Sequence, residues 1–121
     1  MANTFKVISF AAEPASAGTA YKMYTVAGST TTVVLGLILT NIHSTAVTVE
    51  VELVSNTGSR GGDNDVTNTT SFLVKDVSIP AGSSLELLSG GKVVLEATDE
   101  IKIDCSVTDK ISGTLSIMEI T

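Results

Sequence analysis

Apolar and polar residues alternate along most of this chain with the two-residue period of a β-strand. In 47–53 the odd-numbered positions carry valine or leucine and the even-numbered positions carry threonine or glutamate, and 101–107 alternates in the same way. Each of these strands therefore has one apolar face for a core and one polar face. The segment Thr31–Asn41 differs, because six of its eleven residues are large and apolar and they occupy both faces. A strand covered on both faces is predicted to lie at the centre of a sheet.

The complete pattern predicts eight or nine short strands and no helix. The expected strands are Asn3–Phe10, Tyr21–Val26, Thr31–Asn41, Val47–Val54, Phe72–Val77, Leu85–Leu88, Val93–Glu96, Ile101–Val107 and Ile111–Ile120. Such spacing is typical of an all-β fold, an antiparallel β-sandwich with either jelly-roll or immunoglobulin-like topology. The short connection 42–46 favours a hairpin between its two flanking strands. Positive φ angles are expected at Gly28 and Gly82, in turns.

The 121 residues are enough for one domain. Residues 19–121 are predicted to form the sandwich, and residues 1–18 a flexible arm with a short strand, because 11–18 is rich in small residues and interrupted by Pro14. The segment Ser55–Thr70 is the longest stretch without periodicity. Loops of this length are usually functional, mobile or ordered by a partner.

Composition narrows the possible function classes. Charged residues make up 17% of the chain, the net charge is −6, and the seven lysines and arginines are scattered. A surface for nucleic acid needs a basic patch, so no nucleic-acid partner is expected. The apolar run 33–39 is too short to cross a membrane as a helix, and 7–17 does not match a signal peptide. The single cysteine, Cys105, lies in an alternating strand and is expected to be a small buried hydrophobic residue.

The side chains that could carry chemistry do not form a set. His43 has no neighbouring nucleophile or carboxylate in the sequence. The segment Gly61–Asp65 has the composition of a calcium loop, but it lacks the glutamate and the helices of an EF-hand. Asp99 and Glu100 lie together at a turn, where capping is the expected role. We therefore expect no enzyme activity, no catalytic residues, and no metal or cofactor.

Several apolar residues fall on the strand face opposite the main core pattern. They are Tyr24, Val34, Ile38, Met118 and Ile120. One explanation is a thicker core or a strand register that differs by one residue. The other is a subunit interface, because a monomer that exposed such a patch would aggregate. With the polar loop residues Arg60, Asp63 and Asp65, these residues are the candidate interface.

A family resemblance adds a specific function. It is carried by Thr32–Asn41 with Val47–Leu53, by Phe72–Asp76 leading to Ile79–Gly82, by Gly91–Glu96, and by Ser116–Thr121. On these segments the chain resembles small β-rich structural proteins of tailed bacteriophages, most closely virion proteins of short-tailed, T7-like viruses of marine cyanobacteria (cyanophages).

The resemblance implies a non-enzymatic viral protein present in many copies in the particle. It would be a ring or fibre-docking subunit of the tail or neck, or alternatively a decoration (cement) protein on the capsid surface. Its partners would be other copies of itself and other virion proteins (tail adaptor, nozzle, fibre or major capsid protein), with no membrane. Its location would be the virion, after assembly in the host cytoplasm. A carbohydrate-binding or adhesion module is the alternative of another class, and it would need exposed aromatic side chains.

Overall fold

The architecture comes from a computed structural model that describes residues 2–58, 67–88 and 90–121. Within these ranges the chain forms nine β-strands and no helix, which confirms the predicted all-β sandwich. The strands are β1 (Asn3–Glu13), β2 (Tyr21–Thr25), β3 (Thr31–Asn41), β4 (Val47–Val54), β5 (Ser71–Ile79), β6 (Ser84–Leu87), β7 (Val93–Leu95), β8 (Glu100–Cys105) and β9 (Ile111–Ile120).

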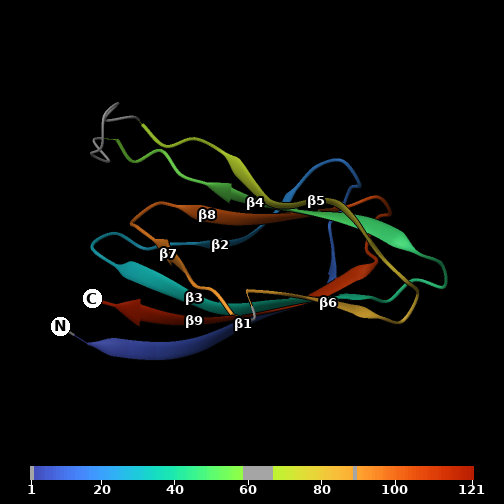
Figure 1. The fold of residues 1–121 in the computed structure, drawn as a ribbon, viewed down its shortest axis with the longest axis horizontal. Coiled ribbons are helices and arrows are strands. Elements are labelled where there is room, and N and C mark those ends of the chain that lie inside the picture. Colours follow the sequence, from blue (N-terminus) through green and yellow to red (C-terminus); the bar gives the residue numbers. More distant parts are fainter. Residues whose placement is uncertain (1, 59–66, 89) are drawn as a thin grey trace.

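The strands build two antiparallel sheets that pack face to face (Figure 1). Sheet 1 has the order β1-β9-β3-β6, with β7 also paired to β3, and sheet 2 has the order β2-β8-β4-β5. The pairings are nested: β1 pairs with β9, β2 with β8, β3 with β6 and β7, and β4 with β5. This is a long antiparallel hairpin rolled into two layers, with β6 and β7 sharing one strand position. The topology is therefore a jelly roll rather than an immunoglobulin-like sandwich.

The predicted hairpin between β3 and β4 is wrong. β3 pairs with β9, β6 and β7 in sheet 1, whereas β4 pairs with β5 and β8 in sheet 2. The connection 42–46 passes from one layer to the other. Both strands bury one apolar face, and placing them in opposite sheets lets these faces pack against each other across the interior. A short polar connection is compatible with either arrangement, so its length alone did not decide between them.

A bulge in β3 changes which side chains face the interior. Its register with β9 shifts between Val34 and Gly36. One extra residue in a strand reverses the alternation beyond it, so Val34 and Leu37 both point inward and are each 1% exposed. The expectation that Val34 lies opposite the core pattern is therefore wrong. β2 also changes register between Lys22 and Tyr24, and Tyr24 is buried as well.

The remaining core follows the predicted alternation. The odd-numbered residues of β4 up to Val51 are buried, as are Ile101, Ile103 and Cys105 in β8. Cys105 is a free, buried cysteine, which agrees with its expected role as a small hydrophobic residue. Aliphatic side chains from both sheets thus fill the interior without tryptophan or phenylalanine at its centre.

The N-terminal strand is longer than predicted and belongs to the sandwich. β1 runs to Glu13 and pairs with β9 from Asn3 onward. The division into an arm, 1–18, and a sandwich domain, 19–121, stays a prediction. The positive φ expected at Gly28 occurs instead at Ser29, while Gly82 has the expected positive φ of 72°.

The buried side chain of Asn41 fixes the passage from sheet 1 to sheet 2. Its Nδ2 donates to the carbonyl oxygens of Thr45 and Ile79, both at 2.9 Å, and its Oδ1 accepts from the backbone N–H of His43 at 2.7 Å. The end of β3, the connection to β4 and the end of β5 are therefore held by one amide group.

We predict that Asn41→Ala destabilises the protein strongly. Removing the amide leaves buried backbone groups unpaired, and each such group costs about 1–3 kcal/mol, so the free energy of unfolding should fall by about 3 kcal/mol. Urea unfolding followed by circular dichroism measures the change. The matched control is Asn3→Ala at an exposed position of β1, which should change stability by less than about 0.5 kcal/mol. Equal losses for both variants would contradict the assigned role.

Candidate assembly interface

The two outer faces of the sandwich differ in chemistry. The outer face of sheet 2 carries the charged residues Lys22, Glu50, Glu52, Lys75, Glu100, Lys102 and Asp104. Two ion pairs cross it, Lys75 with Glu50 at 2.8 Å and Lys22 with Glu100 at 3.1 Å. Such a face is well hydrated and disfavours burial against another protein.

The outer face of sheet 1 is crossed by an apolar row. The strand registers place Phe5 of β1 opposite Met118 of β9, Met118 opposite Val33 of β3, and Val33 opposite Val94 of β7. Directly opposed residues on one face of a sheet are close neighbours, so these four side chains form a continuous line across four strands.

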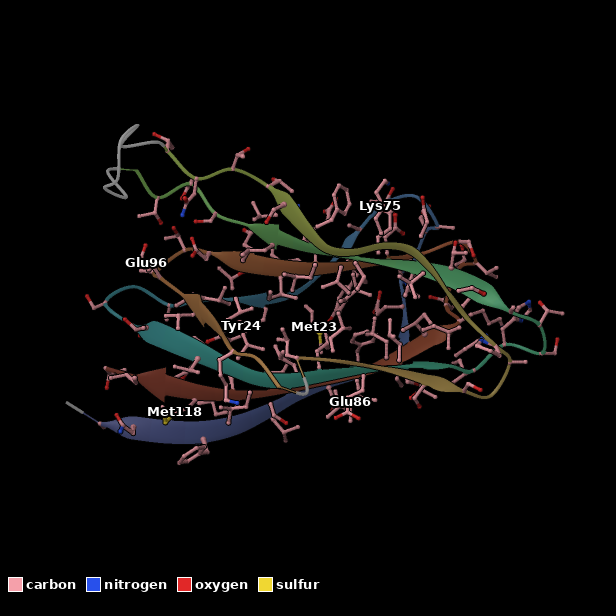
Figure 2. The ribbon with its side chains drawn as sticks, viewed as in Figure 1. Met23, Tyr24, Lys75, Glu86, Glu96 and Met118 are labelled. Carbon is pink, nitrogen blue, oxygen red and sulfur yellow. The ribbon has the colours of Figure 1, made fainter. Side chains whose placement is uncertain are left out.

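Further apolar residues extend this row into a patch. We call the patch the outer apolar face; its members are Phe5, Val7, Val33, Ile38, Val94, Met118 and Ile120. Phe5, Val7 and Val94 are 71%, 65% and 60% exposed. Serine and threonine fill most of the other outward positions, and Glu86 is the one charged side chain among the described strand residues of this face. Figure 2 shows Glu86 and Lys75 on opposite outer sides of the sandwich.

The structure brings together three of the predicted interface residues and separates the others. Ile38, Met118 and Ile120 lie on the outer apolar face. Tyr24 and Val34 are buried between the sheets, so their expected outward orientation is corrected (Figure 2 for Tyr24). The predicted residues Arg60, Asp63 and Asp65 lie outside the described residues. Participation of any of these residues in a subunit contact stays a prediction.

Phe5, Val7, Val33 and Val94 are not among the interface residues predicted from the sequence. Phe5 and Val7 alternate with Thr4, Lys6 and Ile8, which predicts a strand but does not indicate which of its faces is covered. Their position on the outer face follows from the register between β1 and β9. These strands are far apart in the sequence, so the local alternation of residues does not predict this register.

A polar cluster closes one end of the sandwich beside this face. The Tyr24 hydroxyl lies 2.8 Å from Thr32 Oγ1 and donates to Glu119 Oε2 at 2.6 Å, while Lys6 Nζ contacts Glu119 Oε1 at 2.7 Å. Burial, followed by the hydrogen bond to Glu119, raises the pKa of Tyr24 to about 12. The hydrogen bond from Lys6, followed by the one from Tyr24, lowers the pKa of Glu119. The cluster ties the ends of β1, β2, β3 and β9 together.

The Tyr24 environment predicts a loss of stability in alkali. In a Tyr21→Phe variant Tyr24 is the remaining tyrosine, and we expect its ultraviolet ionisation near pH 12. The folded state holds this proton more tightly than the unfolded state, so its contribution to stability is complete below pH 10.0 and is lost as the pH rises through about 12. Spectrophotometric titration combined with urea unfolding measures both effects. Ionisation of Tyr24 at pH 10.0 would contradict the buried, hydrogen-bonded state.

The described residues offer no assembled metal-binding group. They contain no cluster of three or more histidine, cysteine, aspartate or glutamate side chains. Asp99 caps its turn by accepting from the backbone N–H of Glu96 at 3.0 Å, which agrees with the predicted turn role, whereas the Glu100 side chain pairs with Lys22 of the neighbouring strand. A hollow of about 80 Å³ over β4 and β8 is far below the several hundred Å³ of a typical small-molecule site, whereas a more open hollow of about 350 Å³ beside Leu53, Ser55 and Asn68 reaches that size.

Comparison with known proteins shows the fold but no family. No family model matches the chain, and no curated protein matches it. A chain of the T13 particle of IBDV (infectious bursal disease virus) matches with a TM-score of 0.53 and 11% identity, covering 97% of this protein. A chain of the infectious bursal disease virus Gx strain matches with a TM-score of 0.49 and 13% identity, covering 95% of this protein. A chain of Bacillus endospore appendages, a family of disulfide-linked pili, matches with a TM-score of 0.46 and 16% identity, covering 99% of this protein.

This protein spans 30% of the matched chain from the T13 particle, 33% of that from the Gx strain and 87% of the pilus chain. At 11% identity, the similarity to the chain of the T13 particle shows a shared fold and no more. No helix in the described ranges has the length and apolar character that a membrane crossing requires.

Proposed function

We propose that this protein is a non-enzymatic structural subunit of a virus particle, present in many copies and held through its outer apolar face. The observation that carries the proposal is the contrast between the two outer faces of one sandwich. Sheet 2 presents ion-paired side chains, whereas sheet 1 presents Phe5, Val7 and Val94 with more than half of each side chain exposed. An exposed apolar patch of this kind is typical of a protein–protein contact.

Two further points support a role in a virus particle. The jelly roll is a recurrent fold of viral shell proteins. A chain of the IBDV particle contains a region of the same fold, which covers 97% of this protein. Both points concern the fold. The proposed contact between subunits is supported instead by the chemistry of the outer apolar face.

Within the particle, we propose a ring or fibre-docking position in the tail or neck, with decoration of the capsid surface as the alternative. The tail position is supported by the sequence resemblance to structural proteins of tailed bacteriophages. The capsid alternative is supported by the shared jelly roll. In either position the partners are other copies of this chain and neighbouring virion proteins, and the subunit reaches the virion after assembly in the host cytoplasm.

The carbohydrate-binding alternative receives less support from the described residues. A sugar ring stacks on an open aromatic face, and the ring of Phe72 is covered by Lys75 Nζ, 4.6 Å from its centroid. Tyr24 is buried and Tyr21 packs edge-on against Phe10, with the ring centroids 5.1 Å apart. Phe5 is exposed, but the residue directly opposite it on β9 is Met118, which is apolar.

Particle composition provides the direct test of the proposed role. We expect quantitative mass spectrometry of purified particles of the virus that encodes the chain to find it at a fixed ratio to the portal or major capsid protein. Localisation by labelled antibody then separates tail from head. Absence of the protein from purified particles rejects the proposal.

Charge placed on the outer apolar face should weaken assembly without unfolding the subunit. Val94→Lys inserts a charge at a position that is 60% exposed, so the fold tolerates it while burial in a contact would cost several kcal/mol. The control, Ser78→Lys, inserts the same charge at an exposed position of β5 in sheet 2. We expect light scattering to show at least a ten-fold weaker assembly for Val94→Lys alone, by about 1.4 kcal/mol or more. Equal behaviour of both variants would exclude this face as the contact.

A further inference from the structure

The outer margin of sheet 1 lacks the features that normally protect a free strand edge. β1 is the terminal strand of its sheet and, among the described residues, no strand pairs with its far side (Figure 1). It has eleven residues and keeps a regular register with β9 from Asn3 to Phe10. The only charged residue in that run, Lys6, is ion-paired with Glu119 at 2.7 Å.

The other sheet margins carry protective features. β6 and β7 are four and three residues long, and β2 has five residues, a lysine at position 22 and an irregular register. β5 carries Lys75 and also Asp76, whose φ of 52° interrupts the extended backbone. Natural proteins use short edges, charges and bulges to prevent strand pairing between molecules. A long, regular, apolar edge such as β1 is therefore the one suited to accept another strand.

The hydrogen bonds between β1 and β9 show which backbone groups remain free at this edge. Ala2 and Thr121 exchange both of their backbone hydrogen bonds, at 3.2 and 3.0 Å. Hydrogen-bonded and non-hydrogen-bonded residue pairs alternate along an antiparallel ladder. Because Ala2 belongs to a hydrogen-bonded pair, the other even-numbered residues up to Phe10 also form their backbone hydrogen bonds with β9. The N–H and C=O groups of Asn3, Phe5, Val7 and Ser9 consequently point to the free edge.

We infer that β1 pairs antiparallel with β1 of a second copy of this chain, about a two-fold axis at Val7. The free backbone groups lie on odd-numbered residues, so a two-fold pairing must place odd residues opposite odd residues. Centring the axis on Val7 places Phe5 opposite Ser9 of the second copy and Lys6 opposite Ile8.

The other possible centres are less favourable. An axis at Lys6 would place this lysine directly opposite its own copy, and directly opposed like charges destabilise a strand pair. An axis at Phe5 would shorten the overlap within the regular part of β1. The Val7 centre therefore gives the longest regular pairing without a like-charge contact.

This pairing goes beyond the proposed function, because it follows from the strand edge and not from a role in a virus. It would join the two copies of sheet 1 into one continuous sheet and place their outer apolar faces side by side. A two-fold contact closes at two copies, so a larger assembly needs a second contact. The outer apolar face supplies a candidate for it.

A pair of cysteine variants tests the register directly. In Val7→Cys the two new thiols would face each other across the axis, at the separation of about 5.5 Å between Cα atoms that a disulfide accepts. In Ser9→Cys the thiols would be offset by four residues along the strand, about 14 Å, and out of reach. Both positions are exposed, and Cys105 is buried, so the unsubstituted chain serves as a further control.

We expect mild oxidation of the full chain to cross-link Val7→Cys at least ten-fold faster than Ser9→Cys. Equal rates, or faster cross-linking of Ser9→Cys, overturn the two-fold pairing at Val7. Amide hydrogen exchange of the unsubstituted protein gives a second readout. The amides of Phe5, Val7 and Ser9 should gain protection as protein concentration rises, whereas those of Lys6 and Ile8 are protected throughout. Unchanged exchange at Phe5 and Val7 across the concentration range likewise overturns it, whether or not the protein is found in virus particles.

Discussion

The ladder between β3 and β9 is the interaction on which the rest of the structure depends. It joins the third strand of the chain to the last one and buries Leu37, Leu115 and Ile117 between the sheets, each at most 1% exposed. β9 can then accept β1 on its other side, and β3 can accept β6 and β7. Without this ladder sheet 1 has no centre, and neither the outer apolar face nor the β1 edge would exist. Closing so long a loop is entropically costly, and the buried aliphatic side chains provide the compensation.

The two outer faces differ in chemistry although both sheets share one interior. Both sheets use one face to fill a shared interior, so each strand has only its alternate residues left for the surface. In sheet 2 those residues carry charges that water solvates well, and ion pairs between neighbouring strands balance them. In sheet 1 they are mostly apolar or hydroxyl side chains. The fold requires only one apolar face for each sheet, so the second apolar face of sheet 1 is a property that folding does not explain.

The sequence was informative where strands are regular and less so where they are not. Alternation identified the buried sides of β4 and β8, since both keep one register along their pairing with each other. The alternation placed Val34 and Tyr24 on the wrong strand face, because the register shifts in β3 and β2 reverse or interrupt it. These shifts depend on the partner strand, so the local sequence does not predict them. The alternation found Ile38, Met118 and Ile120 but not the row that Phe5 completes, since that row exists only once four strands from distant parts of the chain are aligned.

A subunit with these two surfaces is suited to assembly by combined weak contacts. The net charge of −6 makes separate copies repel one another, which disfavours random association at low concentration. A β1 pair alone orders few residues and closes at two copies, and the outer apolar face alone has no strand hydrogen bonds to fix its orientation. Together, the edge would set the angle between copies and the apolar face would supply the buried area. When several such contacts form at once, the effective concentration of each rises and the assembly gains far more than one contact provides.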